Sequence, residues 1–150
     1  MLPFHIERLQ GVLPRLKEKI LGISDEVLST CVAGKWSIKQ NIGHLSELDI
    51  VSGARIQEII HGTRVMSPAV FEPKEDYNAQ SIATVVRTFE ISRTESIARY
   101  RNLNFSELEK SSLHPRLNVK MTPVDLALFE AEHDDHHLVR ISEILAVLSK

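Results

Sequence analysis

Apolar residues recur along this chain mainly three and four positions apart, which is the spacing of one face of an α-helix. Four stretches show this spacing. They predict helices over about residues 4–21, from 37 to about 61, from 78 or 81 to about 102, and from 122 almost to 150. Neither an Asn-Gly hairpin signal nor an alternating strand pattern is present. The pattern therefore predicts an all-α four-helix bundle.

Residues at the ends of these stretches support the same boundaries. Ser37 followed by Gln40 is a capping-box pattern, and Gly62 is a plausible stop for that helix. Residues 122–125, Thr-Pro-Val-Asp, supply an N-cap, a proline at the first helical position and an early acidic residue. In the first helix, Pro14 should bend the helix or mark its true start.

Two long connections join the predicted helices, one between the second and third and one between the third and fourth. Each spans about 15–20 residues without strong periodicity, a length that is unusual in compact domains and is often functional. We expect them to cover one end of the bundle. A short helical turn is expected over residues 24–30, and the chain length suits one domain over residues 1–150.

The last predicted helix carries polar residues at positions that its apolar stripe would bury. Stepping back from that stripe by threes and fours reaches His137, Asp134, His133 and Glu130. Burying these groups without partners would cost several kcal/mol, about 2 or more for each group. His133 and His137, four residues apart, can direct ring nitrogens at one point, and His44 in the second helix is the best third ligand. The pattern therefore predicts a three-histidine site for one divalent ion.

Carboxylates near these histidines leave two alternatives open. Glu130-Ala-Glu-His133 resembles the Glu-x-x-His motif of di-iron bundles, but the matching position before His44 is Asn41, which favours one ion over two. Glu130, Asp134 and Glu47 are then interpreted as groups that orient the imidazoles or act as a base near bound water. In a metal-free alternative, the histidines hydrogen-bond with Glu130 and Asp134.

Together, these motifs resemble a known family. The segments 34–38 (Gly-Lys-Trp-Ser-Ile), 41–45 (Asn-Ile-Gly-His-Leu) and 132–137 (Glu-His-Asp-Asp-His-His) are similar to those of the DinB-like (YfiT-like) metalloprotein superfamily. The resemblance implies a four-helix bundle, often a homodimer, with His44, His133 and His137 as ligands. The implied ion is nickel or zinc, with iron or manganese as alternatives. The family includes S-transferases and isomerases that use a low-molecular-weight thiol.

Composition excludes several other classes. The formal net charge is −2 and the basic residues are scattered, so no basic stripe exists to follow a nucleic acid. The chain has no run of about 20 apolar residues to cross a membrane, and its first residues lack the pattern of a signal peptide. With Cys31 as the single cysteine, expected to be buried as a small hydrophobe, we expect a cytoplasmic protein.

Two functions follow from the site. The first is a metal-dependent enzyme, a thiol-dependent S-transferase or a hydrolase, in which the metal activates a thiol or water toward a small-molecule substrate. The second is a non-catalytic metal-binding module of the damage-inducible stress-response type, in which the ion ties the second and fourth helices together.

Overall fold

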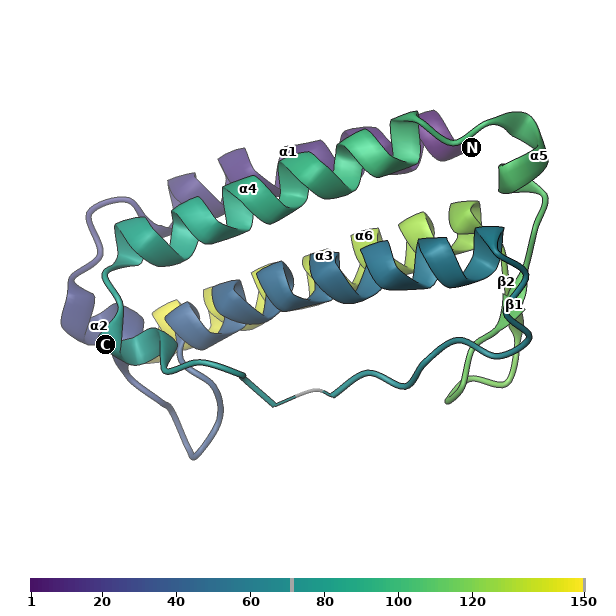
Figure 1. Ribbon diagram of the computed structural model, residues 1–150. Helices are drawn as coiled ribbons and strands as arrows, with labels where there is room; N and C mark the ends of the chain where they lie inside the picture. The colour runs from purple at the N-terminus through teal and green to yellow at the C-terminus, as the bar shows by residue number, and fades with distance from the viewer. Residues whose placement is uncertain (71, 150) are drawn as a thin grey trace.

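Four long helices form the protein, as a computed structural model describes it for residues 1–70 and 72–149. They are α1 (Leu2–Ile20), α3 (Ile38–Ile60), α4 (Ile82–Arg101) and α6 (Pro123–Leu148). Figure 1 shows two layers, with α1 beside α4 in one and α3 beside α6 in the other. Within each layer the two helices run in opposite directions. The predicted all-α four-helix bundle is confirmed.

Local capping sets where these helices begin. Ser37 and Gln40 form the predicted capping box at the start of α3, and Thr122 and Asp125 form another at the start of α6. Short elements occupy the connections: α2 (Asp25–Ser29), the 3-10 helix η1 (Tyr77–Ala79), α5 (Phe105–Leu108), β1 (Ser112–Leu113) and β2 (Lys120–Met121).

Three expectations need correction. Pro14 lies inside α1, which begins at Leu2, so of its two alternatives the start of the helix is excluded and a bend stays a prediction. The connection before α6 contains a small antiparallel sheet, in which Ser112 pairs with Met121. Its two-residue strands are too short for an alternating pattern to show. Cys31 is exposed, because it lies in the irregular segment after α2 instead of on a packed helix face.

The connection between α3 and η1 runs along the α3–α6 layer, below it in Figure 1. Main-chain hydrogen bonds hold it to the rest of the fold near both of its ends. Met66 donates to the carbonyl of Leu113 in β1 at 2.9 Å, and Lys74 donates to the carboxylate of Glu47 in α3 at 2.8 Å. This connection therefore covers a side of the layer, and not only an end of the bundle. Among the described residues, no helix is long and apolar enough to cross a membrane.

A buried charged cluster links the two layers. Arg93 of α4 contacts Asp49 of α3 at 2.9 Å and Asp134 of α6 at 2.6 Å, and it donates to the main-chain oxygen of Leu9 in α1 at 3.1 Å. All four helices thus meet at one guanidinium. Removing one partner of such a buried network is strongly destabilising, because the other charges stay buried.

Candidate metal centre

The three predicted histidines meet between α3 and α6. His44 lies in the first half of α3, while His133 and His137 lie one turn apart in the middle of α6. The Nε2 atom of His133 is 3.2 Å from Nε2 of His44 and 3.2 Å from Nε2 of His137. The three ligand atoms all lie within 4.8 Å of one another. The structure thus brings together a pair from one helix and a single residue from its antiparallel neighbour.

Asn41 determines which nitrogen of His137 carries the hydrogen. Its Nδ2 donates to the main-chain oxygen of Ser37 at 2.8 Å, and its Oδ1 faces Nδ1 of His137 at 2.7 Å. An amide oxygen can only accept, so Nδ1 of His137 must be the donor. The Nε2 atom of the neutral ring then presents a lone pair to the other two histidines.

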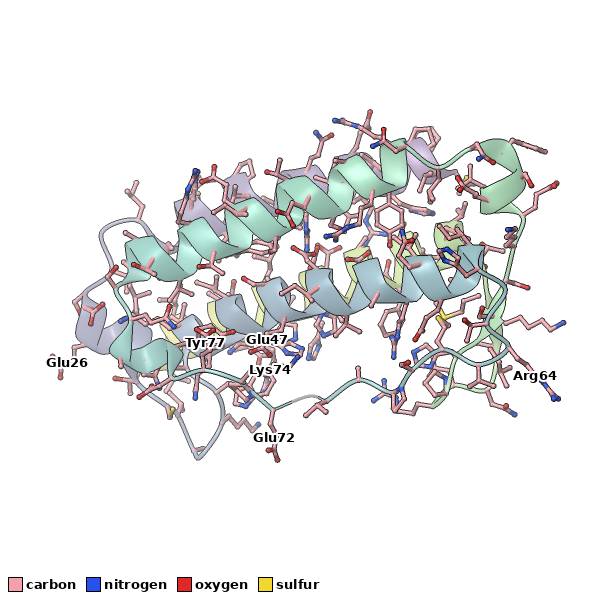
Figure 2. All side chains as sticks on the ribbon, in the orientation of Figure 1. Glu26, Glu47, Arg64, Glu72, Lys74 and Tyr77 are labelled. Atoms are coloured by element: carbon pink, nitrogen blue, oxygen red, sulfur yellow. The ribbon has the colours of Figure 1, made fainter. Side chains whose placement is uncertain are left out.

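Glu47, one turn after His44, lies on the other side of the His44 ring. Its Oε2 atom is 4.0 Å from Nδ1 of His44. Its Oε1 atom accepts from the Tyr77 hydroxyl at 2.6 Å and from the Lys74 main chain at 2.8 Å. Figure 2 shows Glu47, Lys74 and Tyr77 together below α3. Burial, together with Glu47, raises the pKa of Tyr77 well above its usual range, so the hydroxyl stays a donor.

The electrostatics of the cluster keep the imidazoles neutral. Burial lowers the pKa of all three rings, and neighbouring histidines lower two of them further, to about 3 for His133 and about 2 for His137. Neutral imidazole is the form that binds a metal. A tetrahedral ion with bonds of 2.0–2.1 Å spaces its nitrogen ligands about 3.3 Å apart, close to the 3.2 Å that separates His133 from each of the other two histidines. The donor set therefore fits one divalent ion.

The structure separates the other two candidate carboxylates from the histidines. Glu130 accepts from the Tyr100 hydroxyl, and Asp134 pairs with Arg93 through both of its oxygens at 2.6 and 3.0 Å. Of the three sequence candidates, only Glu47 comes beside a histidine. In the described part of the chain, the group that could hold a metal ion contains three histidines and no carboxylate.

A cleft of about 590 Å³ opens beside His137. The Trp36 ring lies next to the cluster, 4.8 Å from the His44 ring and 6.2 Å from the His137 ring. His136 is exposed and lines the cleft. The rest of the lining includes basic, acidic and apolar side chains, among them Lys35, Arg140, Glu143, Ile144 and Val147. A volume of this size is typical of small-molecule sites.

The sequence did not assign two of these neighbours. In the sequence, Asn41 argues against a second ion, and its position three residues before His44 also places it on the same face of α3. Trp36 belongs to the Trp-Ser motif, but no pattern showed that its ring would lie on the histidines. His61, the C-cap residue of α3, is exposed and lies about 25 Å from His44 along the helix, too far to share the site.

Comparison with known proteins adds to this picture. The sequence profile of the DinB superfamily matches residues 6–141. Among solved structures, the fold is similar to that of YfiT from Bacillus subtilis, with a TM-score of 0.84 and 19% sequence identity over 98% of this chain and 87% of that chain. YfiT is described as a probable metal-dependent hydrolase with an unusual four-helix bundle topology. No curated protein matches this sequence.

Proposed function

Because the chain belongs to the DinB superfamily, we propose that it is a divalent-metal-dependent enzyme that activates a thiol or water for attack on an electrophilic small molecule. One observation carries this proposal: Nε2 atoms of three neutral histidines converge beside a cleft large enough for a substrate. A bound ion would lower the pKa of a coordinated thiol or water, so that it is a nucleophile near neutral pH.

The remaining residues hold the ligands in place. Asn41 accepts the Nδ1 hydrogen of His137 and so directs Nε2 inward. Glu47, anchored by Tyr77, faces Nδ1 of His44 and favours the same tautomer there. Glu47 is also the nearest of the candidate carboxylates that could accept a proton during the reaction. We assign Glu130 and Asp134 a positioning role, through the contacts that fix α6 against α4.

The donor set also narrows the choice of metal. Three imidazoles without a carboxylate suit zinc and nickel, whereas sites for iron and manganese commonly include carboxylate ligands. A thiol is a soft ligand that both zinc and nickel accept. A thiol-dependent transferase is therefore the first candidate activity, and a hydrolase the second.

The test begins with protein made without a histidine tag, so that no nickel is acquired from a column. Cobalt-loaded protein should show a visible absorption spectrum that gains a sulfur-to-cobalt charge-transfer band when cysteine is added. His133→Ala should abolish both the spectrum and the band. Turnover is then measured with cysteine and an aryl halide, and with p-nitrophenyl acetate as a hydrolysis probe.

The same experiment separates the enzyme from the non-catalytic module. The module is favoured if one equivalent of metal raises the melting temperature but neither transfer of cysteine to the aryl halide nor hydrolysis of p-nitrophenyl acetate is detected. If the protein does not bind about one metal ion per chain, both functions are wrong, and the metal-free bundle is the remaining interpretation.

A further inference from the structure

Arg55 of α3 is a buried guanidinium without an ion-pair partner among the described residues. Its side chain is 3% exposed. One terminal nitrogen donates to the Ser67 main-chain oxygen at 3.3 Å, another lies 3.3 Å from Nε2 of His114, and Nε has no hydrogen-bond partner in the described chain. Glu58, three residues further along α3, instead accepts from the amide and hydroxyl of Ser67. A buried charge normally has a counter-charge, so this arrangement calls for an anion.

The partner atoms of His114 support the same conclusion. Its Nδ1 atom accepts from the main-chain nitrogens of Arg116 at 3.3 Å and Leu117 at 3.1 Å. The ring hydrogen must therefore sit on Nε2, which faces the Arg55 nitrogen. Two donors thus face each other at 3.3 Å. Burial and the charges of Arg55 and Arg116 lower the pKa of His114, which keeps the ring neutral but leaves this donor pair without an acceptor.

A cavity of about 250 Å³ lies at these groups. Three of its lining side chains contain nitrogen donors, and the others are apolar; none of those described is acidic. They are Arg55, His114, Arg116, Pro68, Ala69 and Pro115. A guanidinium presents a planar fork that matches the two oxygens of a carboxylate. A carboxylate in this cavity would accept from Nε of Arg55 and separate the two opposed donors.

The cavity lies close to the metal centre. The Phe129 ring is 5.9 Å from the His114 ring on one side and 6.4 Å from the His133 ring on the other. The charge of Arg116 contributes to the lowered pKa of both His133 and His114, so it lies near both sites. One aromatic ring therefore separates the cavity from a metal ligand.

Helix geometry fixes the relation along α3. Arg55 follows His44 by eleven residues, or three turns, so the two lie on the same face about 16 Å apart along the axis. The connection between α3 and η1 contacts this part of α3 through Ser67, which accepts from Arg55, and through Lys74, which donates to Glu47. The Phe129 ring lies between the His114 and His133 rings, at 5.9 and 6.4 Å, so these two histidine rings are on the order of 10 Å apart.

We propose that the Arg55–His114 cavity binds a carboxylate group of the substrate, while the reactive end of that substrate lies at the three histidines. This rests on the proposed function for the chemistry at the metal, but carboxylate binding itself can be measured without turnover. The inferred substrate is an extended small molecule with a carboxylate on the order of 10 Å from the reacting atom.

The experiment titrates zinc-loaded, isotope-labelled protein at pH 7 with propionate and follows the amide NMR signals. The amides of Arg116 and Leu117, which donate to His114, should shift and saturate. Propionamide, the neutral isostere, should leave them in place. Arg55→Met should weaken propionate binding about tenfold or more, since a charge-assisted pair is lost. Arg64→Met is the matched control. Arg64 is exposed near the end of α3 in Figure 2, and its variant should bind as wild type does.

Two further measurements distinguish binding from a structural role. Arg55→Met should melt at the same or a higher temperature, because it removes an unpaired buried charge; a clear drop would mean that the arginine serves the fold. His133→Ala should keep propionate binding. If binding disappears in that variant but survives in Arg55→Met, the carboxylate sits on the metal, and the cavity proposal fails while the proposed function stands.

The remaining outcomes are equally decisive. No saturable shift, an equal response to propionamide, or binding of inorganic phosphate but not propionate would each overturn the carboxylate assignment. If the protein takes up no zinc, the proposed function fails, and the same titration of the zinc-free protein still tests the cavity by itself.

Discussion

Asn41→Leu tests whether His137 offers its Nε2 atom to a metal. The substitution removes the oxygen that accepts from Nδ1 of His137 at 2.7 Å and puts an apolar side chain of similar size in its place. Nothing then favours the tautomer with a lone pair on Nε2. Loss of such an outer partner typically lowers metal affinity about 10- to 100-fold, or about 1.4–2.7 kcal/mol. We expect zinc affinity to fall within that range.

Asn41→Asp is the matched variant. A carboxylate at this position still accepts from His137 but no longer donates to the Ser37 carbonyl, which keeps its helical hydrogen bond from the main-chain nitrogen of residue 41. We therefore expect zinc affinity equal to or higher than that of the wild type. The added negative charge should also strengthen the ligand.

Zinc affinity is measured at pH 7 by competition with a fluorescent chelator, and melting of the zinc-free proteins checks that each variant folds. Wild-type affinity in a folded Asn41→Leu protein would refute the tautomer argument. An equal loss in Asn41→Leu and Asn41→Asp would also refute it, because the donor to Ser37 and not the acceptor for His137 would then be responsible.

Three further predictions concern the scaffold. The added methyl group of Gly43→Ala would overlap the Tyr77 ring, so thermal melting should show that the free energy of unfolding falls by about 1–3 kcal/mol. The methyl group of Gly53→Ala meets only the flexible end of the Arg99 side chain, so this variant should lose less stability. In Arg93→Met, the free energy of unfolding measured in urea should fall by about 3–5 kcal/mol, because the buried carboxylates of Asp49 and Asp134 lose their ion-pair partner. A decrease below about 1 kcal/mol would contradict this. Burial, with neighbouring carboxylates, raises the pKa of Glu130 to about 8, so the folded state holds a proton that the unfolded chain releases above about pH 4.5. Wild-type stability should therefore fall relative to Glu130→Gln as pH rises from 5 to 8, by up to about 1.4 kcal/mol per pH unit, and parallel pH curves would contradict that shift.

The sequence was sufficient for the helices and for the choice of histidines, because both depend on local spacing. The capping boxes that begin at Ser37 and Thr122 each involve residues three positions apart, and the spacing of His133 and His137 follows from the rise of one helix. The approach of His44 to that pair was inferred from its place on a helix face. The homodimer and the cytoplasmic location stay predictions.

Contacts between distant segments could not be predicted in this way. Arg93 and Asp134 are 41 residues apart, and no periodic pattern states that they pair. Arg55 and His114 are 59 residues apart and meet only because the small sheet brings its turn back to α3. Cys31 was expected to be buried from its residue type alone, whereas its exposure depends on the path of an irregular segment.

The placement of Glu130 and Asp134 follows from the angles around α6. Residues four apart differ by about 40° around a helix, so Glu130 and Asp134 are centred on one side of α6 and His133 and His137 on another, about 60° away. The sequence pattern places all four residues on one buried stripe and does not distinguish these two sides. In the fold, the carboxylate face meets Arg93 of α4 in the other layer, while the histidine face meets α3.

This division gives the buried charged cluster a part in building the metal centre. Rotation of α6 about its axis would have to break the two hydrogen bonds between Asp134 and Arg93, at 2.6 and 3.0 Å, and both side chains are buried. Asp49 of α3 binds the same arginine at 2.9 Å, on a face of α3 well away from His44. One guanidinium thus fixes the rotation of both helices that supply the histidines, and the ligands are aimed at a common point before any ion arrives.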